Sequence, residues 1–331
     1  MGSQASRPDC QSPRDGHGSP PLLCPEGWTA DRVLVSDRVP DSGDSVGLAA
    51  GIAQARARRD YSALKSLLRQ VAESNYKLRR RWQTARTVPV SHAQCMEFAG
   101  KGHNSPNLSF STMSTADALL HFGRQRGAVV CGLNFANGET AGGGYKKGAT
   151  AQEEDLCRRV PTLYSALFQA EKAGLYPFGP STCWFGCRPE KYADVLYTSD
   201  LVVAREGEEG GFALLPEHRQ ARVSLVSAAA PNVKFKSEVS NPALIYRAIQ
   251  SIFIAPVMIE PHVNTLVLGA WGCGAFGGDP AQISDMFTQA LVHDNLGHPY
   301  REVHFAIPPG KNCDVFLEHF RRHKLKVRIL K

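Results

Sequence analysis

Apolar runs alternate with amphipathic stretches over most of the chain, which predicts strands that alternate with helices. Helical periodicity is expected from about Ser114 to Gln125, Asp155 to Ala173, Pro242 to Ile254, Pro280 to His293 and Asp314 to Arg322, and Pro256 is expected to end or kink its helix. Strands are expected at Val88–Val90, Val129–Phe135, Asp194–Val203, Arg222–Ala228, Thr265–Gly269, Val303–Ile307 and Lys326–Leu330. This alternation is typical of an α/β fold with a mostly parallel sheet between helices.

The N-terminal part follows a different pattern. Residues 1–44 are rich in Ser, Pro, Asp, Arg and Gly, so we expect a disordered tail. From Ser45 to about Gln70 the apolar spacing predicts one helix with a basic face. The basic run that starts at Lys77 is expected to be a solvated face rather than a polymer-binding patch. A loop around Tyr176–Pro180 is expected to expose its aromatic rings.

A glycine loop separates the strand at Val129–Phe135 from the helix that follows it. Three consecutive glycines leave no side chains in the way and permit positive φ, so a ligand could touch the backbone directly. A seven-residue spacer then leads to Gln-Glu-Glu at a helix start, where one carboxylate could hold a hydroxyl and the other could transfer a proton. The residues concerned are Gly142, Gly143, Gly144, Gln152, Glu153 and Glu154.

A structural explanation of the acidic pair stays open at this stage. Thr150 and Glu153 have the spacing of a capping box, in which both side chains satisfy free amides at a helix start. Acidic residues in a first turn also suit the helix dipole. The glycine triplet favours the functional interpretation, because a helix cap needs no such loop.

The spaced pattern Asn-Phe-Ala-Asn from Asn134 to Asn137, then Gly-Gly-Gly, then Gln-Glu-Glu resembles the signature of the poly(ADP-ribose) glycohydrolases, in particular their microbial-type branch. The resemblance covers about Ser45 to Lys331. It implies a macrodomain-like three-layer α/β/α sandwich with a mixed, mostly parallel sheet, preceded by an N-terminal helical extension. Pro161 departs from the family pattern and is expected to bend the helix after Gln-Glu-Glu or end its first turn.

A second glycine loop runs from the strand at Thr265–Gly269 into a helix, with Asp279 and Pro280 as expected N-cap and first helical residue. The loop lacks the Lys-Ser/Thr of a P-loop. It matches G-x-G-x-x-G, but it stands near the end of the chain and no acidic residue follows the next strand, which disfavours NAD. Free amides at a helix start would suit a phosphate, and the resemblance favours the diphosphate of ADP-ribose as that ligand. The candidate ligand-binding residues are Gly272, Cys273, Gly274, Ala275, Phe276 and Gly277.

The resemblance also implies roles for individual residues. Glu154, the last residue of the motif, would be the general acid, and Glu153 would fix a neighbouring hydroxyl. Asn137 would hold the distal ribose, while Phe276 would orient the terminal ribose; the plain alternative for Phe276 is a loop residue tucked into the core. No metal and no cofactor would be required.

The composition of the chain indicates its type of partner and its cellular compartment. The formal net charge of +7 in 331 residues suits a polyanionic partner without demanding one. Nine scattered cysteines indicate a reducing, intracellular compartment, and the lone C-x3-C pair Cys183 and Cys187 disfavours zinc. No secretory signal or run of 18 apolar residues is visible. The start Met1-Gly2 fits the N-myristoylation pattern, which would give weak membrane anchoring.

The sequence thus predicts a tail over residues 1–44 and a catalytic domain over residues 45–331. The expected activity is hydrolysis of ribose–ribose O-glycosidic bonds in poly(ADP-ribose), with ADP-ribosylated proteins as partners, in the cytoplasm or nucleus. Sequence-specific nucleic acid binding is not expected. Two alternatives remain: removal of mono-ADP-ribose from protein or nucleic acid, and non-catalytic binding of ADP-ribose.

Overall fold

The computed structural model describes residues 45–98, 105–185, 189–234 and 240–330, all of which belong to one compact unit. Their centre is an eight-stranded sheet with the order β1-β4-β5-β3-β6-β7-β2-β8, in which β4 is antiparallel to both of its neighbours and the other pairs are parallel. The expected mixed, mostly parallel sheet is confirmed. The strands are β1 (Thr87–Val90), β2 (Asn107–Ser111), β3 (Val130–Ala136), β4 (Val195–Val203), β5 (Ala221–Ala229), β6 (Thr265–Leu268), β7 (Glu302–Ala306) and β8 (Val327–Ile329).

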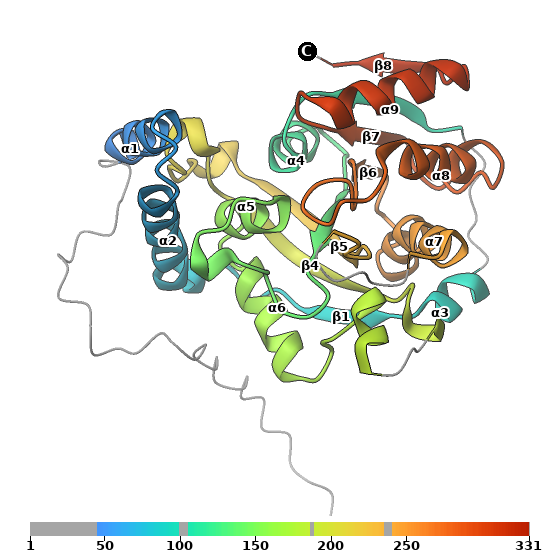
Figure 1. The fold of residues 1–331 in the computed structure, drawn as a ribbon, viewed down its shortest axis with the longest axis horizontal. Helices are drawn as coiled ribbons and strands as arrows, with labels where there is room; N and C mark the ends of the chain where they lie inside the picture. Colours follow the sequence, from blue (N-terminus) through green and yellow to red (C-terminus); the bar gives the residue numbers. More distant parts are fainter. Residues whose placement is uncertain (1–44, 99–104, 186–188, 235–239, 331) are drawn as a thin grey trace, which may run out of the picture. The chain divides into compact units, whose positions relative to one another are not determined.

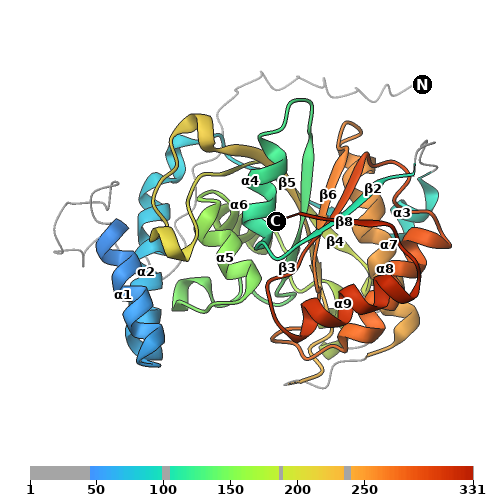
Figure 2. The same cartoon turned by 90° about the horizontal axis from the view of Figure 1, so that it is seen from above.

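Helices cover both faces of the sheet, which gives three layers (Figures 1 and 2). One face carries α4 (Thr115–Gly123), α5 (Gln152–Arg159) and α6 (Leu163–Lys172), and the other carries α3 (His92–Glu97), α7 (Pro242–Ile259), α8 (Pro280–Val292) and α9 (Lys311–Arg322). Each face buries its own large apolar cluster. Because β3, β5 and β6 lie between these clusters, both of their faces are apolar, as expected for central parallel strands.

The N-terminal extension consists of two helices rather than the single helix expected from the sequence. Helix α1 (Ser45–Ala57) ends before Arg59, which has a φ of 55°, and α2 (Tyr61–Leu78) begins after Asp60. The Asp60 carboxylate caps α2 by accepting a hydrogen bond from the amide of Ala63. A short polar turn therefore divides a sequence whose apolar spacing alone looks continuous.

Several local expectations were wrong. Helix α7 does not end at Pro256 but continues through this buried proline to Ile259. Phe178 is buried and makes an edge contact with Tyr176, so the aromatics of this loop are not exposed. Strand β2 and helix α3 were not anticipated.

Helix α7 is, among the described residues, the one helix long and apolar enough to cross a membrane by length and composition. Half of that stretch is buried, and it packs against β4, β5 and α3. We therefore assign α7 to the core of the fold. The expectations for residues 1–44 lie outside the described residues, as do the side chains of Cys183 and Cys187.

Candidate active site

The first glycine loop leaves the carboxyl end of β3 and folds directly over the two glutamates. Gly142 and Gly143 have φ values of 66° and 53°, in the region that side chains disfavour. A Cβ added to Gly143 would lie 2.8 Å from Oε1 of Glu154 and 3.2 Å from Oε2 of Glu153. The glycines are therefore needed because the backbone must approach the carboxylates this closely.

Glu154 is fixed at one oxygen only. Its Oε1 accepts a 2.8 Å hydrogen bond from the amide of Gly144. Among the described residues, no group donates a hydrogen bond to Oε2. The side chain is buried, so its free oxygen is held in a defined place by the loop and by the first turn of α5. This is the geometry required of a group that handles a proton at a fixed position.

Glu153 is engaged at both oxygens. Oε2 accepts a 2.9 Å hydrogen bond from the amide of Asn137, and Oε1 accepts one of 3.2 Å from Nδ2 of Asn134. Burial raises the pKa of Glu153 to about 8, and the neighbouring charge of Glu154 also raises it, while the amide donors oppose the shift. Glu153 is therefore mostly protonated at neutral pH.

The capping-box interpretation of this helix start is wrong. Helix α5 has Ala151 as its N-cap residue and no side-chain cap. Glu153 instead accepts from Asn137 and Asn134, and Glu154 from Gly144, all outside the helix. The two carboxylates therefore accept hydrogen bonds from β3, from the residue that follows it and from the first glycine loop, and not from the free amides of the helix start.

Gln152 ties the start of α5 to β3. Its Oε1 accepts a 2.8 Å hydrogen bond from the amide of Phe135, while Nε2 donates to the carbonyl of Leu133 at 2.8 Å and to Oγ1 of Thr115 at 3.0 Å. These contacts place Glu153 and Glu154 relative to the sheet. Asn137 is similarly occupied, since its Oδ1 accepts from the amides of Glu139 and Thr140.

A cavity of about 630 Å³ lies beside this cluster. The second glycine loop forms one wall through Gly272, Gly274, Ala275 and Phe276, and Gln152 belongs to the lining as well. Cys273 and Gly277 are absent from the lining, as are Asn137, the first glycine triplet and both glutamates. The lining does include Gln152 and Asp155, the residues on either side of Glu153 and Glu154.

The second glycine loop has free space beside its backbone, whereas the first packs closely against protein side chains. Gly274 is exposed, and a Cβ added there would meet no atom within 4 Å. Phe276 is half-buried against the core while it lines the cavity, and its carbonyl accepts hydrogen bonds from the amides of Val233 and Lys234. Buried Trp271 anchors the loop by donating from Nε1 to the carbonyl of Ala228 at 2.9 Å.

The cavity also meets two helix N-termini without side-chain caps. Helix α5 begins after Ala151 and helix α9 after Gly310, and the residues around both starts line the cavity. By contrast, Asp279 caps α8 by accepting from the amide of Ala281, as its sequence predicts. Uncapped amides and the helix dipole favour an anion, so the starts of α5 and α9 suit a diphosphate better than the start of α8.

Sequence reasoning missed part of this lining. The missed residues include Ser114 and Thr115 after β2, Asp155 after the glutamates, and the segment from Ala306 to Asn312 after β7. A signal was present: Pro308-Pro309-Gly310 follows a strand and precedes a helix, as both glycine loops do. In a parallel sheet such segments meet at one edge.

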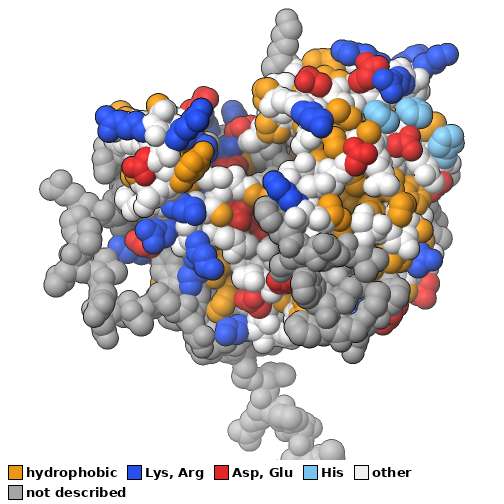
Figure 3. All heavy atoms as spheres, in the orientation of Figure 1, with side chains coloured by type: hydrophobic (Ala, Val, Ile, Leu, Met, Phe, Trp, Pro, Cys, Tyr) orange, Lys and Arg blue, Asp and Glu red, His pale blue; other side chains and the backbone are white. Residues whose placement is uncertain are grey.

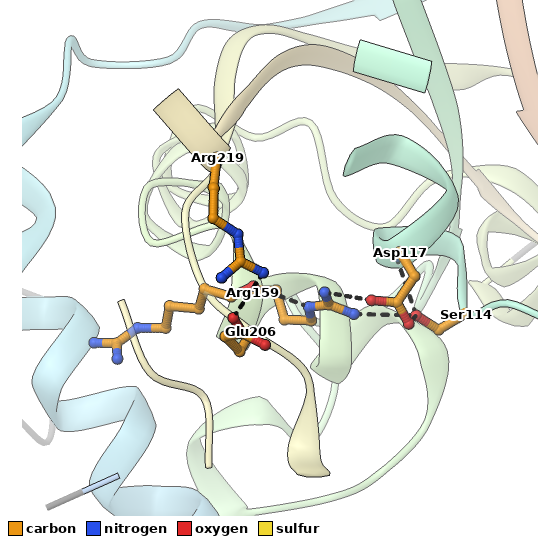
Figure 4. A network of polar contacts seen from close by, with 6 residues as sticks. Ser114, Asp117, Arg159, Glu206 and Arg219 are labelled. Carbon is orange, nitrogen blue, oxygen red and sulfur yellow. Dashed lines mark hydrogen bonds and ion pairs between the residues drawn. The ribbon is translucent and has the colours of Figure 1, made fainter. Parts of the chain in front are cut away.

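A buried arginine joins α5, the helix that carries the two glutamates, to the part of the cavity wall around Ser114 (Figure 4). Arg159 at the end of α5 donates to Oγ of Ser114 at 3.1 Å and to Oδ1 of Asp117 at 2.6 Å. Burial would raise the pKa of Asp117, but the hydrogen bond and charge of Arg159 outweigh it and hold this pKa below its ordinary value. Nearby, Arg219 and Glu206 form a separate ion pair at 3.1 Å. The ends of α4 and α5 are thus held together beside the cavity.

Comparison with known proteins agrees with this geometry. Residues 42–205 match the sequence model of the family described as "Microbial-type PARG, catalytic domain", which includes the first glycine loop and both glutamates. Among curated proteins, no sequence matches.

Solved structures share the fold. The poly(ADP-ribose) glycohydrolase of Thermomonospora curvata has a TM-score of 0.63 and 23% identity, covering 76% of this chain and 99% of its own; it was also solved with the inhibitor ADP-HPD, at 24% identity. The Deinococcus radiodurans enzyme in complex with ADP-ribose has a TM-score of 0.60 and 23% identity, covering 74% and 97%. The expected α/β class is confirmed by these likenesses. With the family match, they allow a plain conclusion: the chain belongs to the microbial-type poly(ADP-ribose) glycohydrolase family.

Proposed function

We propose that this protein hydrolyses the ribose–ribose O-glycosidic bond of poly(ADP-ribose) and releases ADP-ribose, with Glu154 as the general acid. The observation that carries the proposal is the placement of Glu154, whose Oε1 is fixed by the Gly144 amide while Oε2 accepts no hydrogen bond from a described residue. Membership of a glycosidase family gives the reaction class. ADP-ribose bound to the Deinococcus radiodurans enzyme indicates the kind of ligand.

The cavity has the properties that an ADP-ribose unit requires. Its volume of about 630 Å³ falls within the range of ordinary small-ligand sites. The uncapped starts of α5 and α9 would accept the diphosphate, and Lys311 adds a basic side chain to the described lining. Phe276 supplies an aromatic surface for the terminal ribose. Binding of these parts would hold the scissile bond against Glu154.

Cleavage would use one proton donor. Glu154 would protonate the leaving ribose oxygen as the glycosidic bond breaks through an oxocarbenium-like state, and the resulting carboxylate would accept a proton from the attacking water. No metal or cofactor enters this scheme.

Glu153 is the competing proton donor, since its pKa of about 8 keeps it protonated at neutral pH. Its geometry argues against that role, because Asn137 and Asn134 hold both of its oxygens. We assign Glu153 to positioning.

The N-terminal helices support a polymeric substrate. Residues 45–86 contain ten basic and two acidic side chains, an excess larger than that of the whole chain. Figure 3 shows Lys and Arg side chains gathered over α1 and α2. Helix α2 also contacts the first glycine loop, because Nδ2 of Asn75 donates to the Tyr145 hydroxyl at 3.2 Å and to the carbonyl of Arg158 at 2.8 Å. A polyanion leaving the site would meet this basic surface.

Incubation with poly(ADP-ribose), and separately with mono-ADP-ribosylated protein, tests the proposal. Release of free ADP-ribose from the polymer is expected. Release only from the mono-modified protein would replace polymer cleavage by mono-ADP-ribose removal. Binding of ADP-ribose without release from either substrate would make the protein a non-catalytic reader.

Location and lipidation remain proposals, and residue 2 lies outside the described part of the chain. An intracellular protein, cytoplasmic or nuclear, fits the substrate class. If Gly2 is myristoylated, Gly2→Ala will move the protein from the membrane fraction to the soluble fraction of cells. An unchanged distribution would end the lipidation proposal.

A further inference from the structure

A cluster of two histidines and one aspartate lies on the surface formed by α8 and α9, outside the proposed active site. Asp285 of α8, His319 of α9 and His323, the C-cap residue of α9, each offer one ligand atom, and the three atoms all lie within 4.8 Å of one another. Figure 3 shows His side chains next to acidic ones over these two helices. Across the described residues, this is the one group of three such side chains close enough to share an ion.

The geometry of the cluster fits a tetrahedral metal. His319 and His323 are four residues apart, so they lie on one face of α9, and their rings are stacked with centroids 6.2 Å apart. Nε2 of His323 lies 3.4 Å from Oδ1 of Asp285. Two ligands that each lie about 2.0–2.2 Å from zinc are separated by about 3.3–3.6 Å in a tetrahedron. The distance between His323 and Asp285 therefore already fits zinc. Rotation of the exposed Asp285 side chain can shorten its distance to His319.

His319 has unused bonding capacity. Its Nδ1 is buried and has no hydrogen-bond partner among the described residues. Buried polar atoms without partners are uncommon in native proteins and often mark a missing ion or water. His304 provides the contrast, since it is fully buried and its two ring nitrogens contact the hydroxyls of Ser109 and Ser111 at 2.8 and 2.9 Å.

We propose that Asp285, His319 and His323 bind a zinc-class divalent cation that joins α8 to α9. Imidazole nitrogen with one carboxylate suits Zn²⁺ and neighbouring transition metals, whereas Mg²⁺ prefers oxygen ligands alone. Water would take the fourth position. Helix α9 starts at the cavity, and Lys311 at its start is about 12 Å along the helix from His319. The ion therefore acts on the stability of the cavity wall, and not on the reaction.

Titration calorimetry of the full chain with ZnCl2 at pH 7.5, and separately with MgCl2, tests the site. His323→Ala and Asp285→Asn are expected to weaken one zinc site at least 10-fold. His218→Ala, which removes an exposed histidine of another loop, is the matched control and should leave zinc binding unchanged.

A second readout separates the site from zinc bound by cysteines. One equivalent of Zn²⁺ should raise the melting temperature of the wild-type protein and of His218→Ala, but not that of His323→Ala. Equal zinc stoichiometry, affinity and thermal shift in wild type and His323→Ala would overturn the proposal. MgCl2 producing the same effects as ZnCl2 would also overturn it, because the site would then not be of the zinc class.

Discussion

The two glycine loops leave neighbouring parallel strands, β3 and β6, but they use glycine for opposite purposes. In the first loop, Gly143 lies against the carboxylates so closely that a single methyl group would collide with them. In the second, Gly274 faces open space beside the cavity. One loop holds protein groups in place, and the other leaves room for a ligand.

This difference separates chemistry from binding within one site. Hydrogen bonds from Gly144 and Asn137 fix the acidic pair before any ligand arrives. The second loop and the uncapped starts of α5 and α9 present backbone groups to the cavity. Substitutions in the first loop should therefore lower turnover, and those in the second should lower affinity.

Among substitutions in the two loops, the largest expected effect comes from Gly143→Ala. Its Cβ would displace the carboxylates of Glu153 and Glu154, and the positive φ adds about 1–2 kcal/mol of strain. Because a misplacement of about 1 Å can cost 100-fold in rate, polymer cleavage should fall at least that far. Steady-state kinetics measures this, with circular dichroism to establish folding. A folded variant with normal turnover would show that the close approach has no catalytic purpose.

The same change at Gly274 is the matched control for Gly143→Ala. Gly274→Ala should leave folding and stability unchanged, because no atom lies within 4 Å of the added group. The larger Gly274→Val should obstruct the diphosphate and weaken ADP-ribose binding at least 10-fold, or about 1.4 kcal/mol. Calorimetry with ADP-ribose distinguishes the two variants. Unchanged affinity in folded Gly274→Val would remove the second loop from the binding site.

Another expected effect concerns the pH dependence of stability. The folded-state pKa of Glu153 is about 8, above its ordinary value of 4.5, so the native state binds more protons between these values. The free energy of unfolding should thus fall as pH rises from about 4.5 to 8, by at most about 1.4 kcal/mol per pH unit. Glu153→Gln should lose this component. Urea unfolding of both proteins at pH 5, 6.5 and 8 gives the difference, and parallel pH profiles would contradict the raised pKa.

Much of this arrangement was predictable because local patterns determine it. Strand β3, both glycine loops and the Asp279-Pro280 helix start could be read from short stretches of sequence. The expected interruption near Pro161 is also present, since α5 ends at Arg159 and α6 starts at Leu163.

Other parts depend on contacts between distant segments. Strand β2 escaped prediction because it buries Ser109 and Ser111, whose partner His304 lies on β7, almost 200 residues away. The wall from Ala306 to Asn312 joins the cavity only when β7 and β6 pair in parallel. The hydrogen bonds that Glu153 accepts from Asn137 and Asn134 likewise form only in the folded chain. The local sequence does not show them, so a capping box remained plausible from sequence.

The measurement that tests the central claim most directly is a comparison of Glu154→Gln with Glu153→Gln. Glutamine keeps the shape of glutamate and one carbonyl acceptor but cannot transfer the proton. Single-turnover cleavage of poly(ADP-ribose) should fall 10²–10⁴-fold in Glu154→Gln, or about 3–5 kcal/mol of barrier, and less in Glu153→Gln. ADP-ribose affinity should survive in both. Near wild-type cleavage by Glu154→Gln, or a larger loss in Glu153→Gln, would contradict the assignment of Glu154 as the general acid.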